Sequence, residues 1–177
     1  VWEDEYASKV SGDSLMQRAA EETYKQGTPP AEVLLLTCGC DCQDDRLSMS
    51  VWGIGRDEEM YLVDRIVLHG SPSRAEVWKQ LDEVLQKPYE TEDGRKLNIE
   101  VCCIDSGGHH TQEVYGYARE RAAMGVIAIK GMNVKGKPPL GKPSKVDINY
   151  KGRAMKNGAQ LFGVGVDGVK SLLFGRL

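Results

Sequence analysis

Three short apolar runs, separated by polar turns, occupy residues 33–68 and constrain the fold more than any other feature of this sequence. Residues 33–42 form a mostly apolar run of strand length. Residues 47–54 alternate apolar and polar side chains, as a half-buried strand does, and residues 60–68 form a third run. Because tight turns join neighbouring antiparallel strands, the sequence predicts a three-stranded meander here.

The hydrophobic period then changes to that of a helix. Apolar side chains predict a helix over residues 73–86, with Ser73 as its N-cap and Glu76 completing a capping box. A second helix is expected from about Thr111 to Gly125. Between these two helices the sequence predicts a polar loop at residues 88–97, then a strand at residues 99–104.

A long loop is the main feature expected of residues 126–177. A short strand is expected at residues 126–129, and residues 131–158 form a long loop rich in Lys, Gly and Pro. A last strand at residues 161–166 leads into a terminal helix that opens at Asp167.

This order of elements predicts an α/β domain over residues 31–177. A meander that feeds strand–helix–strand crossovers gives a mixed sheet flanked by helices, in which strand 33–42 lies parallel to strand 99–104. By analogy, this is the order of the ribonuclease H-like fold. Residues 1–30 are expected to form a helical arm or linker, because they hold few apolar residues and because Pro29 and Pro30 stop a helix.

Composition places the chain among folded proteins without membrane spans. Hydrophobic residues make up 41% and charged residues 28% of the 177 residues, which disfavours a disordered chain. No run reaches the roughly 18 apolar residues of a membrane span, so no membrane partner is expected. The start lacks Met and resembles no signal peptide, so we expect a fragment of a longer protein with reduced cysteines.

Charge is distributed unevenly along the chain. The formal net charge is −3, yet residues 130–177 hold ten basic and two acidic residues. This basic third of an otherwise acidic chain predicts an anionic partner such as nucleic acid, although a solvated Lys-rich loop explains it equally well.

Two aspartates are the leading candidates for chemistry. Asp41 and Asp105 end the two strands that are predicted to be parallel, so they should lie side by side at the carboxyl edge of the sheet. Adjacent carboxylates repel unless a cation lies between them, and Mg²⁺ or Mn²⁺ suits an all-carboxylate site. Two such ions would suit phosphodiester hydrolysis. Asp41 taken alone could simply begin a polar turn.

The remaining candidates keep two interpretations each. Asp167 is either a third metal ligand or the N-cap of the terminal helix. His109 and His110 either have a functional role, in contact with a phosphate or at the metal site, or are ordinary polar residues at a helix start. The alternating cysteines at 38, 40 and 42 lack a second ligand pair for zinc, so buried, apolar packing is expected of them.

Several motifs taken together resemble the nuclease domain of lambda-type phage terminase large subunits. The resemblance runs in order from about residue 33 to the end of the chain. It is carried by Leu36-Thr37 with Gly39, Asp41, Gln43 and Asp45-Arg46-Leu47, by Asp105-Ser106-Gly107-Gly108-His109-His110-Thr111, by Ile129-Lys130-Gly131, by Pro143-Ser144-Lys145 and by Gly165-Val166-Asp167.

The resemblance implies a ribonuclease H-like endonuclease that cuts concatemeric viral DNA during packaging in the host cytoplasm. It implies a separate N-terminal ATPase motor, of which residues 1–30 would be the tail or the linker. It also implies a small terminase subunit and a portal or procapsid as partners. Asp41 and Asp105 match the family's metal-binding acids, and Asp167 matches a further position of the motif. Residues expected to contact double-stranded DNA are Lys130, Lys135, Lys137, Lys142, Lys145, His109 and His110.

Two other functions remain open at this point. The chain could be another nuclease of the same fold, such as a resolvase-like or transposase-like enzyme, which would prefer branched DNA. It could instead be a non-catalytic module that docks DNA or a portal. Such a module would retain DNA without metal, and a change at Asp41 would not affect it.

Overall fold

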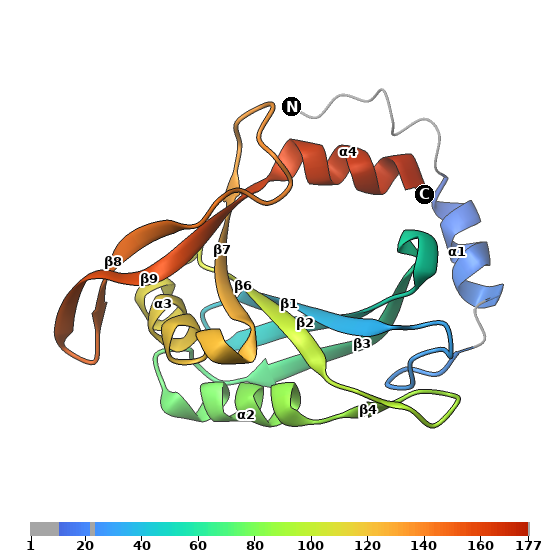
Figure 1. Ribbon diagram of the computed structural model, residues 1–177, viewed down its shortest axis with the longest axis horizontal. Coiled ribbons are helices and arrows are strands. Elements are labelled where there is room, and N and C mark those ends of the chain that lie inside the picture. Colours follow the sequence, from blue (N-terminus) through green and yellow to red (C-terminus); the bar gives the residue numbers. More distant parts are fainter. Residues whose placement is uncertain (1–10, 22–23, 177) are drawn as a thin grey trace.

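A seven-stranded mixed sheet forms the centre of the computed structural model, which describes residues 11–21 and 24–176 (Figure 1). The strand order is β3-β2-β1-β6-β7-β9-β8. The strands are β1 (Leu35–Cys42), β2 (Arg46–Ile54), β3 (Met60–His69), β6 (Ile99–Asp105), β7 (Val126–Met132), β8 (Ser144–Tyr150) and β9 (Arg153–Gly165).

The sheet has the predicted mixed architecture. Strands β3, β2 and β1 pair antiparallel as a meander, whereas β1, β6, β7 and β9 run parallel to one another. Strand β8 returns antiparallel to β9 at the edge. The predicted parallel pairing of the first strand with the strand that begins at residue 99 is therefore confirmed.

Two helices, α2 (Ala75–Gln86) and α3 (Thr111–Glu120), cover one face of the sheet. They meet at Trp78 and Tyr117, whose ring centroids lie 4.6 Å apart. Under them lie the buried residues of alternating strand positions, including Cys38, Cys40 and Cys102. The predicted burial is therefore confirmed for Cys38 and Cys40, whereas Cys42, at the end of β1, is only half-buried.

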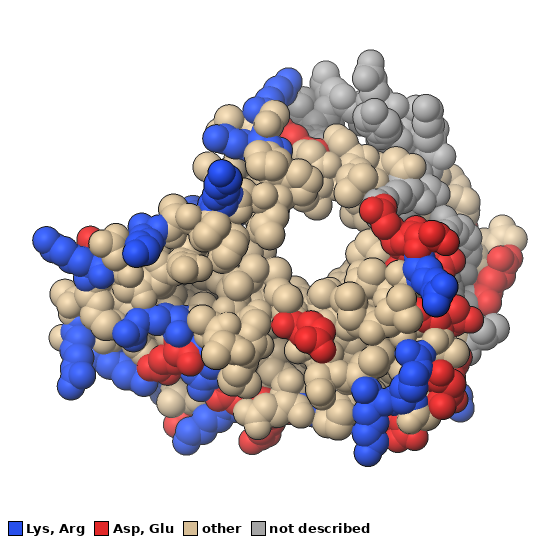
Figure 2. All heavy atoms as spheres, viewed as in Figure 1, with Lys and Arg blue, Asp and Glu red and all other residues tan. Residues whose placement is uncertain are grey.

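The opposite face, which we call the open face, bears Gly39 and Asp41 of β1, both exposed. It is covered by neither α2 nor α3. Helix α4 (Val166–Arg176) lies across from the meander, and Figure 2 shows an opening between them. Helix α1 (Gly12–Glu21) belongs to the predicted N-terminal arm, of which residues 1–10 and 22–23 lie outside the described part.

The prediction of a loop over residues 131–158 is wrong for much of this segment. Strand β8 and the first part of β9 form a long hairpin there. The hairpin turn is Lys151-Gly152, and both residues have positive φ, as a two-residue turn of type I′ requires. Many Lys and Gly residues hide a weak alternation in which Ile148 and Ala159 are buried. Strand β7 is correspondingly longer than predicted and ends at Met132.

Two smaller predictions are also corrected. The expected loop at residues 88–97 contains a two-stranded ribbon of β4 (Tyr89–Glu90) and β5 (Lys96–Leu97). The capping box at Ser73 does not form, because α2 begins at Ala75 after an Arg74 N-cap without a side-chain bond. The Ser73 hydroxyl instead lies 2.9 Å from the Ser71 hydroxyl. Short 3-10 turns occupy Arg56–Glu58 (η1) and Ala122–Met124 (η2).

The hairpin is fixed to the body of the domain where Gly116 of α3 faces the ring of Tyr150. An ideal Cβ at Gly116 would overlap this ring. The backbone N–H of Asn149 also donates to Oε1 of Gln112 at 2.6 Å. The absence of a side chain at position 116 thus allows β8 to lie against the helix.

Gly116→Ala should destabilise the domain by about 1–3 kcal/mol, because overpacking displaces either Tyr150 or α3. Chemical denaturation would measure the free energy of unfolding. Gly12→Ala is the matched control: no atom lies within 4 Å of its ideal Cβ, so a change below about 0.5 kcal/mol is expected. Equal effects of the two substitutions would contradict this packing.

Candidate active site

Asp41 and Asp105 lie next to each other where β1 and β6 end. The parallel register pairs Gly39 with Cys103 and Cys40 with Ile104, so the next residue on each strand is one of the two aspartates. Adjacent strands are about 4.8 Å apart, and register partners point to the same face. The structure thus brings together the two carboxylates that the sequence predicts to be neighbours, on the open face.

No cation neutralises this carboxylate pair within the described residues. Asp41 is exposed, and its Oδ2 accepts a hydrogen bond from Nε2 of Gln43 at 2.8 Å. Asp105 is half-buried, and its Oδ1 accepts from the backbone N–H of Gly107 at 2.9 Å. Neither forms an ion pair with a described Lys, Arg or His. Two neighbouring negative charges therefore remain uncompensated by the described Lys, Arg and His side chains.

The loop after Asp105 is held in place by backbone contacts. Ser106 is buried, and its hydroxyl donates to the carbonyl oxygen of Ile129 at 2.8 Å. The Thr111 hydroxyl lies 2.9 Å from the carbonyl oxygens of both Ser106 and Gly108. These bonds fix the start of α3 beside the carboxylate pair.

Further acidic side chains surround Cys42, the last residue of β1. Burial raises the pKa of the Cys42 thiol, and the carboxylates of Asp41, Glu113, Asp105 and Asp44 raise it further, to about 12. Asp44 and Glu113 are thus near the pair. The sequence patterns singled out neither Asp44 nor Glu113 as a candidate ligand. The topology offered a signal, because the turn after β1 and the first turn of α3 meet at one sheet edge.

The two histidines lie at this acidic rim. Nδ1 of His109 is 3.0 Å from Oδ1 of Asp44, and Nε2 of His110 is 3.7 Å from the same oxygen. Nδ1 of His110 lies 4.0 Å from Oε2 of Glu113. His109 is largely exposed, so its ring is accessible from solvent. Both side chains therefore face carboxylates, and their predicted contact with a phosphate stays a prediction.

Asp167 lies in the first turn of α4, directly after β9. Helix α4 begins at Val166, so Asp167 is inside the helix rather than at the N-cap position, and its charge suits the first turn. Strand β9 is separated from β6 by β7. Within residues 11–21 and 24–176, no three Asp, Glu, His or Cys side chains are arranged to hold one metal ion. The role of Asp167 as a third ligand stays a prediction.

The carboxylate pair nevertheless suits a hard divalent cation. Mg²⁺ is commonly bound by only one or two carboxylates, while water and substrate phosphates supply its remaining ligands. Asp41 and Asp105 offer this oxygen donor set on an accessible face. The residues present therefore fit Mg²⁺ or Mn²⁺ better than zinc, which prefers nitrogen and sulfur ligands.

The predicted DNA-contacting lysines lie on the opposite half of the sheet from the meander. Lys130 is on β7 and Lys145 on β8, and the other three lie in the segment that connects these strands: Lys135, Lys137 and Lys142. All five are exposed. Lys and Arg side chains gather on this side of the molecule, over the hairpin and the connecting segment (Figure 2).

Comparison with known proteins agrees with this arrangement. The family described as "Terminase large subunit gpA, endonuclease domain" matches residues 1–177. The chain belongs to this family. Its sequence-based identification with lambda-type terminase nuclease domains is therefore confirmed.

Two terminase large subunits are similar over nearly the whole chain. The large subunit of Enterobacteria phage P21 is 32% identical over 177 residues, and that of Escherichia phage lambda is 32% identical over 176 residues. These alignments cover 100% and 99% of the chain but 26% of each relative, so the gpA-type endonuclease domain spans about a quarter of their length. No solved structure matches the chain. Among the described helices, none has the length and apolar character needed to cross a membrane.

Asp105→Asn should stabilise the gpA-type domain in EDTA, because it removes one of two adjacent negative charges and keeps the oxygen that accepts from Gly107. An increase of about 1 kcal/mol in the free energy of unfolding is expected for two charges near 5 Å in a largely aqueous setting. Urea denaturation at low ionic strength would measure it. Asp41→Asn should give little further gain in the double variant, whereas full additivity would contradict the repulsion.

Proposed function

We propose that this domain is a metal-dependent endodeoxyribonuclease that cuts concatemeric viral DNA during genome packaging. The proposal is carried by one observation, the pair of adjacent carboxylates at Asp41 and Asp105, which no described Lys, Arg or His side chain pairs, in a chain whose family is an endonuclease domain. A structural role explains this pair poorly, because two uncompensated neighbouring charges destabilise the folded state.

In this proposal Asp41 and Asp105 hold two Mg²⁺ or Mn²⁺ ions, and Asp167 is the third ligand. Bound ions supply activation of water for attack on phosphorus and stabilisation of charge on the departing oxygen. Loop 106–110 fixes Asp105 through the bond from Gly107. His109 and His110, at the rim, position a phosphate of the scissile strand.

The basic side of the sheet would bind the DNA backbone. Lys130, Lys135, Lys137, Lys142 and Lys145 are exposed and supply charge without a pattern of base-edge contacts. We therefore expect salt-dependent binding with little sequence preference. The cutting site would then be chosen by partners of the complete protein, namely the small terminase subunit, an ATPase motor in the rest of the chain and the portal or procapsid.

Plasmid cleavage tests the catalytic proposal. The unaltered chain should nick and linearise plasmid DNA with Mn²⁺ or Mg²⁺ and be inactive in EDTA. Asp41→Asn and Asp105→Asn should each lower the rate at least about 100-fold, because each removes several kcal/mol of transition-state stabilisation. Glu100→Gln is the matched control, since Glu100 is an exposed carboxylate at the other end of β6.

Cleavage that survives both aspartate substitutions would contradict the assigned site. If every version retained DNA but cut none, with metal present, a docking module would be the better description. A strong preference for branched over linear duplex would instead favour a resolvase-like enzyme.

Removing the charges of Lys137 and Lys142 should weaken duplex binding at all sequences. With both changed to Gln, the slope of log K against log salt should fall by about 0.9 for each DNA phosphate that the variant no longer neutralises. Fluorescence anisotropy in EDTA would measure binding without cleavage. Lys79→Gln on α2, at the helix-covered face, should leave the slope unchanged. If Lys79→Gln lowered the slope equally, duplex binding would depend on the net charge of the domain and not on the position of these lysines.

A further inference from the structure

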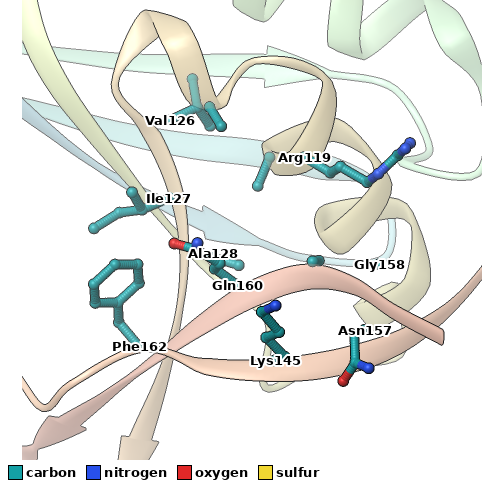
Figure 3. Close-up of a pocket in the computed structure, with 12 residues that line it drawn as sticks. Arg119, Val126, Ile127, Ala128, Lys145, Asn157, Gly158, Gln160 and Phe162 are labelled. Atoms are coloured by element: carbon teal, nitrogen blue, oxygen red, sulfur yellow. The ribbon is translucent and has the colours of Figure 1, made fainter. Parts of the chain in front are cut away.

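A pocket of about 330 Å³ opens where β9 separates from β7 (Figure 3). Strand β9 pairs with β7 only from Leu161 onward, and before this point it pairs with β8 alone. The first residues of β7 are therefore left without a neighbour on that side. We call the resulting cavity the fork pocket. Ile127 and Phe162, both half-buried, give it an apolar wall.

The polar part of the fork pocket is cationic. Arg119, in the last turn of α3, and Lys145, on β8, both line it and are both exposed. Neither forms an ion pair with an acid in the described chain. The described lining residues include no Asp or Glu. Figure 3 shows the Arg119 guanidinium directed away from the cavity, so an anionic group entering the pocket would meet Lys145.

Two amides complete the lining. Gln160 is the cross-strand partner of Lys145, and both lie beside the cavity in Figure 3. Asn157, whose backbone N–H donates to Oδ1 of Asp147 at 2.8 Å within the hairpin, is exposed and also lines the pocket. Amide side chains donate and accept hydrogen bonds at once, as the edge of a nucleobase does. The fork pocket therefore combines an apolar ring, amides and a cation in one cavity.

The sheet register relates this pocket to the carboxylate pair. Asp105 pairs with Ile129, and Ile129 pairs with Phe162, so Phe162 stands in the same row two strands from Asp105. Two strand spacings are about 10 Å. At the roughly 3.4 Å rise of a stacked strand this is about three nucleotides, and it is fewer where the strand is unstacked. One DNA strand could therefore contact both places.

We propose that the fork pocket binds one nucleotide of an unpaired DNA strand, with its phosphate at Lys145 and its base against Phe162. This inference rests on the proposed function, because it takes DNA to be the substrate. The base must be unpaired, since a cavity of this size lies at the small end of ligand pockets and a stacked, paired base cannot enter it. The site would hold the strand near the cut while its partner strand is displaced.

Binding of a labelled oligothymidylate about ten nucleotides long tests the pocket. Anisotropy in EDTA, compared with a duplex of equal length, separates binding from cleavage. Phe162→Leu should weaken single-strand binding about fivefold or more, because it removes the stacking surface, and should leave duplex binding unchanged. Lys145→Gln should weaken single-strand binding and lower its salt slope by about 0.7.

Lys156→Gln is the matched control, since Lys156 is an exposed lysine of the same hairpin that does not line the pocket. Its effect should stay within about twofold. The inference is overturned if the unaltered chain does not bind the oligothymidylate. It is also overturned if Phe162→Leu and Lys145→Gln behave like Lys156→Gln, or if Phe162→Leu weakens duplex binding equally. Thermal melting would confirm that each variant is folded.

The two proposals fail in different ways. Metal-dependent plasmid cleavage with normal single-strand binding by the pocket variants would retain the nuclease and remove the fork pocket. The opposite result is that the pocket variants lose single-strand binding while the unaltered chain cuts no DNA with any metal. That result would support the fork pocket and contradict the proposed catalysis.

Discussion

The in-register parallel pairing of β1 with β6 is the constraint on which the rest of this domain depends. It sets Cys38 beside Cys102 on the buried face and carries Asp41 and Asp105 to the same edge on the other face. Because side chains alternate along a strand, a shift of one residue would exchange these two faces. The core and the candidate site are therefore fixed by the same set of backbone hydrogen bonds.

Helices on one face leave the other available for chemistry. Trp78 and Tyr117 join α2 and α3 into a single layer over the buried strand residues. The open face can then hold charged groups at modest desolvation cost, since Asp41 remains exposed. Acidic groups gather at one end of β1 and β6, while unpaired cations lie toward β8 and β9. A polyanion would be repelled by the acidic ends of β1 and β6 and attracted by the basic side at β8 and β9. A cation bound at Asp41 and Asp105 would remove this repulsion.

Much of the fold could be predicted from the sequence, because several segments have a clear hydrophobic period. The alternation of residues 47–54 and the period of residues 73–86 identified β2 and α2. The hairpin at β8–β9 was missed because its strands hold Lys, Gly and Asn, whose individual β-propensities are low. Its stability comes from a turn of two residues with positive φ and from packing of Tyr150 on Gly116. Composition alone does not reveal such contacts.

The sequence by itself determined the order of elements and the family resemblance, because hydrophobic period and motifs are local properties of the chain. That order also predicted Asp41 and Asp105 to be neighbours, and the pairing of β1 with β6 placed them so. The tertiary structure decided which other residues join them. It brought Asp44 and Glu113 near Cys42, put Asp167 inside α4 beyond β7, and opened the fork pocket between Lys145 and Phe162. These placements depend on how strands diverge and helices begin in space, which no periodicity along the chain records.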